Sequence, residues 1–93
     1  MNFEIYKTLV ASTAHVEPSD FRVLEDNPES FIIYDHYYGT KIYIHEEILS
    51  DIAKFSFSEG LRLLILFATS NGCRFLDLDS DGPVYDDFPT TDW

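Results

Sequence analysis

The chain has 93 residues, of which 17 are acidic and six are basic, so its formal net charge is −11 at neutral pH. Lys and Arg supply most phosphate contacts, and this balance therefore disfavours direct binding of nucleic acid or of an anionic membrane. The length and the 45% hydrophobic content fit one folded domain, which we expect to span residues 1–93. One cysteine excludes an internal disulfide, and we see neither a signal peptide nor a membrane-spanning run, so we expect a cytoplasmic protein.

The first predicted elements are a strand, a helix and a β-hairpin. Residues Phe3–Ser12 alternate between apolar and polar side chains and then become mostly apolar, which predicts a strand. The segment PSDFRVLEDN predicts a short helix that begins at Pro18 and ends near Asn27. The segment SFIIYDHYYGTKIYIH contains two strand-like runs around a turn near Gly39, where a positive φ costs least.

The second half of the chain predicts two helices and a last strand. Residues Glu46–Phe55 place apolar side chains at helical spacing. The letters SFSE at residues 56–59 match an S-x-x-E capping box, which predicts a helix from Phe57 to about Ser70 that stops at Gly72. Residues Cys73–Leu78 alternate again and predict the final strand.

The predicted order of elements, β-α-β-β-α-α-β, indicates an α+β fold. We expect a single βαββαβ-like sandwich in which an antiparallel sheet has its helices packed on one face. The helix at residues 57–70 is apolar on nearly every side, so one sheet cannot cover it. The preceding short helix and the aromatic side chains of the C-terminal segment could cover the rest, and so could a second copy in a homodimer.

The acidic, aromatic C-terminal segment 77–93 (DLDSDGPVYDDFPTTDW) holds six Asp and no Lys or Arg. Such a segment attracts cationic surfaces, and its rings provide apolar contact area. Tyrosines on the predicted hairpin add rigid amphipathic area of the kind that anchors protein interfaces. The alternative is that the charge keeps the protein soluble while the rings cover the sheet. The candidate partner-binding residues are Asp77, Asp79, Asp81, Asp86, Asp87, Tyr37, Tyr38, Tyr85 and Trp93.

Three patterns could carry chemistry. Residues 77–82 read DLDSDG and resemble the opening of a calcium-binding loop, but Phe88 occupies the twelfth position where a bidentate Glu is required. The three histidines and the cysteine lack zinc spacing, so we expect no metal and no cofactor. Ser12 or Thr13 with His15 could serve as nucleophile and base of a small hydrolase. No glycine-rich oxyanion element accompanies them, so we favour a structural turn and no enzymatic activity.

Three segments, STAH at residues 12–15, GCRFLDLDSDGP at 72–83 and DFPTTDW at 87–93, also suggest a family. With them the chain resembles, over nearly its whole length, an uncharacterised family of small domains from bacteria, plasmids and phages. The resemblance implies an accessory protein of a mobile element and transfers no catalytic residues.

The function that we expect is inhibition of a nucleic-acid-binding host defence protein, of the anti-CRISPR or anti-restriction type. The carboxylates would act as a DNA mimic by occupying a basic surface meant for phosphate. One alternative is an immunity protein that neutralises a nuclease toxin. The others are the small hydrolase and a housekeeping module with no inhibitory role.

Overall fold

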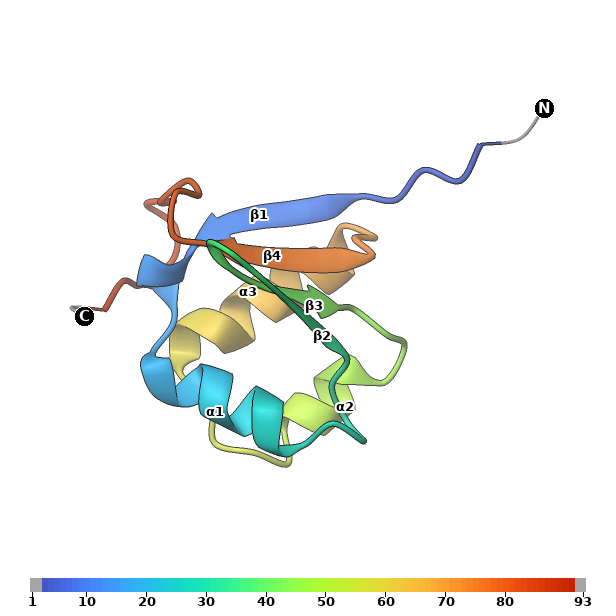
Figure 1. The fold of residues 1–93 in the computed structure, drawn as a ribbon, viewed down its shortest axis with the longest axis horizontal. Helices are drawn as coiled ribbons and strands as arrows, with labels where there is room; N and C mark the ends of the chain where they lie inside the picture. Colours follow the sequence, from blue (N-terminus) through green and yellow to red (C-terminus); the bar gives the residue numbers. More distant parts are fainter. Residues whose placement is uncertain (1–2, 92–93) are drawn as a thin grey trace.

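The computed structural model describes residues 3–91, and its elements follow the predicted order (Figure 1). The strands are β1 (Thr8–Ser12), β2 (Ile33–His36), β3 (Gly39–Tyr43) and β4 (Phe75–Asp79). The α-helices are α1 (Pro18–Asp26), α2 (Ile48–Ile52) and α3 (Glu59–Ser70), and a short 3-10 helix, η1 (Thr13–His15), follows β1.

The strands form one mixed sheet in the order β1-β4-β3-β2. β3 is antiparallel to both β2 and β4, whereas β1 runs parallel to β4. The α+β class is therefore confirmed, but the prediction of an antiparallel sheet fails for β1. The reason is the connection: all three helices lie between β1 and β4 in the chain, and such a long crossover, unlike a tight turn, permits parallel pairing.

The helices lie on one face of the sheet, as predicted (Figure 1). Alternate residues of β4 point toward them, so Leu76 and Leu78 are fully buried while their neighbours are only partly buried. α3 packs against β4 and α2, and the ring of Phe67 lies 5.7 Å from that of Phe88 in the C-terminal segment. The short helix and Phe88 therefore cover part of α3, but Leu66 and Phe67 remain about half exposed. A homodimer stays a prediction.

β1 begins at Thr8 and not at Phe3. The five residues of β4 pair one for one with Thr8–Ser12, so the residues before Thr8 have no strand residue opposite them. Residues 3–7 are exposed. Alternation in the sequence indicates which residues could form a strand, but the length of the partner sets where β1 begins.

The β2–β3 hairpin is confirmed, although the reason proposed for Gly39 is wrong. Among the described residues only Gly72, just after α3, has a positive φ, at 70°. Gly39 instead allows close approach, since a Cβ at this position would lie 1.8 Å from the carbonyl oxygen of Leu78. The turn itself is formed by Tyr37 and Tyr38.

α3 begins at Glu59, and its N-cap is Ser58, whose Oγ accepts the amide of Leu61 at 3.3 Å. The predicted capping box of Ser56 with Glu59 is therefore wrong. Ser58 is held in this N-cap position by Asp20, a buried carboxylate in the first turn of α1. Asp20 accepts the amide of Ser58 at 2.8 Å, its hydroxyl at 2.5 Å and the amide of Glu17 at 2.8 Å. One side chain thus joins the beginnings of α1 and α3.

Replacing Asp20 by asparagine is expected to lower the free energy of unfolding by about 2 kcal/mol. The amide NH2 of asparagine would face hydrogen-bond donors that the second carboxylate oxygen now satisfies. Chemical denaturation measures the change, with Asp26→Asn at the exposed end of α1 as the matched control. Equal denaturation midpoints for the two variants would contradict this role for Asp20.

Candidate protein-interaction surface

Of the C-terminal segment, residues 77–79 belong to β4, and residues 80–91 fold back along β1 and η1 (Figure 1). The amide of Ser12 donates to the carbonyl of Pro83 at 2.8 Å. At the other end of the segment, Thr91 donates through its amide to Ala14 O at 2.7 Å and through its hydroxyl to Val16 O at 2.9 Å. The segment is therefore fixed to the domain at both ends.

His15 holds the middle of the C-terminal segment. It is fully buried, and its Nε2 accepts the amide of Tyr85 at 2.9 Å. Because an amide can only donate, Nδ1 carries the proton and donates to Pro89 O at 2.8 Å. The imidazole also stacks on the ring of Tyr85 and meets Phe88 edge-on.

This arrangement bears on the hydrolase alternative. Both imidazole nitrogens of His15 are occupied by backbone groups, and the Oγ of Ser12 accepts the amide of Ala14 at 3.0 Å as the cap of η1. The geometry therefore does not supply the free ring nitrogen that a serine or threonine nucleophile would need.

The five candidate aspartates lie in three different places. Asp77, on the sheet face opposite the helices, has its Oδ1 2.6 Å from Nε2 of His36. Asp79 ends β4 and Asp81 lies in the loop that follows it, and Asp79 Oδ1 accepts the amide of Asp81 at 2.8 Å. Asp86 and Asp87 are exposed farther along the C-terminal segment. Trp93 lies outside the described residues.

The two hairpin tyrosines lie beside the first part of this loop. Tyr37 is 93% exposed, Tyr38 is 50% exposed, and their ring centroids are 4.9 Å apart. The amide of Ser80 donates to the carbonyl of Tyr38 at 2.8 Å, which places Asp79 and Asp81 next to the tyrosines. The structure therefore brings together four candidate residues, the two tyrosines and the two aspartates, although the sequence did not predict that they lie side by side.

An open groove of about 530 Å³ runs from the hairpin turn to α1. Phe21 and Glu25 of α1 line it together with the tyrosines, and no Lys or Arg does. We call Glu25, Asp79, Asp81, Tyr37 and Tyr38 the acidic end. Sequence reasoning missed Glu25, whose only signal was its position one helical turn after Phe21. Within the described residues, no Lys, Arg or His forms an ion pair with the three carboxylates of the acidic end. Exposed aromatic rings beside such carboxylates suit contact with a basic protein surface.

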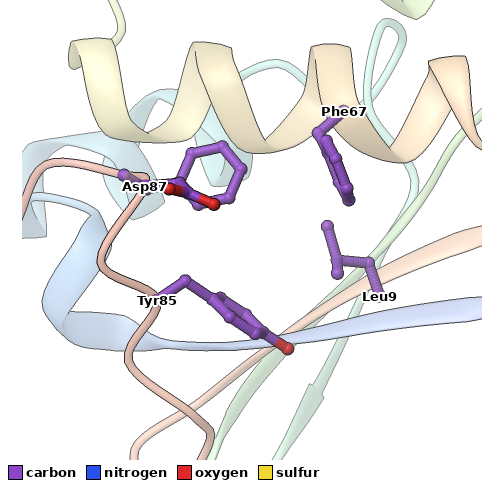
Figure 2. A pocket seen from close by; sticks show the side chains of 5 residues that line it. Leu9, Phe67, Tyr85 and Asp87 are labelled. Carbon is purple, nitrogen blue, oxygen red and sulfur yellow. The ribbon is translucent and has the colours of Figure 1, made fainter.

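Tyr85 and Asp87 belong to a second site, a pocket of about 510 Å³ between α3, β1 and the C-terminal segment (Figure 2). Leu9, Phe67 and Phe88 complete its walls. The hydroxyl of Tyr85 donates to Val10 O at 2.6 Å, which fixes one wall to β1. Leu9 lies in the predicted first strand, Phe67 in the predicted apolar helix and Phe88 in the C-terminal segment, and no sequence signal marks the three as one pocket.

Within residues 3–91, no group of three or more His, Cys, Asp or Glu side chains is placed to hold a metal ion. The helices of this same part of the chain are all too short or too polar to span a bilayer.

A family model matches residues 8–93, and the chain therefore belongs to that family, described as a family of unknown function (DUF5983), C-terminal domain. Comparisons with curated proteins and with solved structures found no match. This family is consistent with the predicted membership of an uncharacterised family of small domains, and its description assigns no reaction.

Proposed function

We propose that this domain is a small acidic module that binds a basic surface of a partner protein through the acidic end. The observation that carries the proposal is the near-complete exposure of Tyr37, which stands beside Tyr38 and the Asp79–Asp81 loop. A large ring in that position gains contact area only when a partner covers it.

In the proposed complex the two tyrosines anchor the contact and the carboxylates surround them. Tyrosine side chains bury much apolar area and lose little rotamer entropy, which suits the centre of an interface. Glu25 and Asp81 are exposed and make no side-chain hydrogen bond or ion pair within the described residues, so they are available to Lys or Arg of the partner. The net charge of −11 would accelerate the encounter with a basic protein.

The partner in this proposal is a nucleic-acid-binding defence protein of the host, such as a CRISPR effector or a restriction nuclease. The domain would act in the cytoplasm as a phage or mobile-element inhibitor, with its carboxylates where phosphates normally bind. Asp77 is left out of the contact because it is already paired with His36. An immunity protein against a nuclease toxin would use the same surface on a different basic partner.

The test compares two variants that remove the same charge. Glu25→Gln with Asp81→Asn removes two of the three carboxylates of the acidic end. Glu46→Gln with Glu47→Gln removes two exposed carboxylates after β3, at the opposite end of the sheet. Binding to purified CRISPR effectors and restriction nucleases of the host is measured by calorimetry at low and high salt. We expect the first variant to lower affinity about tenfold and the second less than about twofold.

Tyr37→Ala is expected to lower the same affinity by about tenfold or more, because it removes the proposed anchor. The loss of affinity caused by Tyr37→Ala should be the same at high salt. The loss caused by Glu25→Gln with Asp81→Asn should become smaller, because salt screens the charges. An affinity that does not change with ionic strength, or an equal loss in both charge variants, would rule out the proposal.

A further inference from the structure

The pocket beside β1 has an unusual combination of walls. Three aromatic rings and Leu9 line it, and Asp87 supplies its one charged side chain. The ring of Phe88 lies 5.7 Å from that of Phe67 at 78° and 6.2 Å from that of Tyr85 at 75°. In Figure 2, Phe67 and Tyr85 stand on opposite sides of the opening, with Asp87 at one end and Leu9 at the other.

The walls are held by contacts that do not involve a ligand. Tyr85 is fixed through its hydroxyl to Val10 O and through its amide to His15. Phe88 packs edge-on against the buried ring of His15 at a centroid distance of 6.0 Å. The pocket is therefore largely formed before anything binds, which lowers the ordering cost of binding.

The charge of the pocket is uncompensated. Asp87 is exposed, and within residues 3–91 its carboxylate makes no hydrogen bond or ion pair. Phe67 keeps 47% of its surface exposed although it belongs to the apolar run at residues 63–68 of α3. An open apolar space with aromatic walls and one free carboxylate is complementary to a cation that carries its own apolar surface.

We infer that this pocket binds a methylated ammonium group. A methylated ammonium has a positive charge for Asp87 and the ring faces, and its methyl groups fill apolar space. An unmethylated ammonium is strongly hydrated and loses more on entering such a pocket. A neutral hydrocarbon gains nothing from the carboxylate. The group could belong to a free quaternary amine or to a methylated lysine of a protein. The inference does not rest on the acidic end.

Choline and 3,3-dimethylbutan-1-ol provide the first test, because the second replaces the quaternary nitrogen of the first by carbon. Both are titrated into the full chain while the ring signals of Phe67, Tyr85 and Phe88 are followed by NMR. We expect choline to shift these signals and to bind about tenfold more tightly than the neutral isostere. Equal affinities, or no shift of the pocket signals with choline, would overturn the inference.

Two variants with matched controls locate the binding. Asp87→Asn is expected to weaken choline binding about fivefold, and Phe67→Leu about tenfold, because each removes one source of cation attraction while keeping a similar shape. Asp86→Asn and Phe3→Leu alter exposed residues outside the pocket and should change affinity less than about twofold. Unchanged binding in Asp87→Asn and Phe67→Leu would place choline elsewhere and refute the site.

A peptide arm identifies the source of the group. Peptides of one sequence carrying either lysine or trimethyl-lysine are titrated in parallel with choline. Tighter binding of the trimethylated peptide than of choline indicates a protein ligand, whereas tighter binding of choline indicates a free amine. Equal binding of the two peptides, with neither displaced by choline, would contradict the proposed ligand class.

Discussion

Replacing Gly60 by alanine is expected to destabilise the domain by about 3 kcal/mol, although the same change in an ordinary helix stabilises by about 1 kcal/mol. Gly60 lies in the first turn of α3 and is buried against η1. A Cβ at this position would lie 1.7 Å from the carbonyl oxygen of His15. That oxygen belongs to the backbone, so relief of the clash requires α3 to move away from η1.

Chemical denaturation of Gly60→Ala measures its free energy of unfolding, which should fall where Gly→Ala in an ordinary helix would raise it. Gly72→Ala serves as the control, because Gly72 has a φ of 70° but a Cβ there would meet nothing within 4 Å. Its cost should be limited to the strain of a left-handed residue, about 1 kcal/mol. A Gly60→Ala variant at least as stable as the unmodified protein would show that α3 and η1 are not in close contact.

The second large effect is expected for His15→Ala, which should lower the free energy of unfolding by about 4 kcal/mol. The substitution removes a fully buried ring and leaves the amide of Tyr85 and the carbonyl of Pro89 without their partners. It also removes the stacking surface of Tyr85. We therefore expect the C-terminal segment to detach before the rest of the domain unfolds.

Two measurements separate these effects. Denaturation gives the global change, and hydrogen exchange at the amide of Tyr85 reports the detachment of the segment. His36→Ala is the matched control, since His36 is exposed and its contact with Asp77 should be worth less than about 1 kcal/mol. If His15→Ala and His36→Ala unfolded at the same denaturant concentration, His15 would not be the support described here.

The elements predicted correctly are those with local signals. The stop of α3 at Gly72, the hairpin between β2 and β3 and the start of α1 at Pro18 each follow from residues that are neighbours in the chain. The features that were missed depend on residues far apart. Asp20 and Ser58 are 38 positions apart, and His15 and Pro89 are 74 apart. No periodicity or capping pattern reports such pairs.

For the candidate surface, too, local features were predictable and contacts between distant residues were not. Composition predicted tyrosines and aspartates as interface residues, but it could not tell that Asp77 pairs with His36 while Asp79 and Asp81 lie beside Tyr38. It also could not identify the pocket, because Phe67 has the same character as the core residues of α3 around it. Side-chain type was predictable, and spatial grouping was not.

The position of β4 in the sheet has a consequence for how the domain is made. β4 is synthesised after the other described strands, yet it lies between β1 and β3, and among the described strands it alone pairs with β1. Until β4 has been synthesised, β1 has no strand to pair with, and one edge of the β2–β3 hairpin has no hydrogen-bonded neighbour. The described sheet can therefore close only after β4 has been synthesised, and closing it joins residues that are far apart in the chain. This topology favours slow formation and leaves unpaired strand edges exposed to other chains until then.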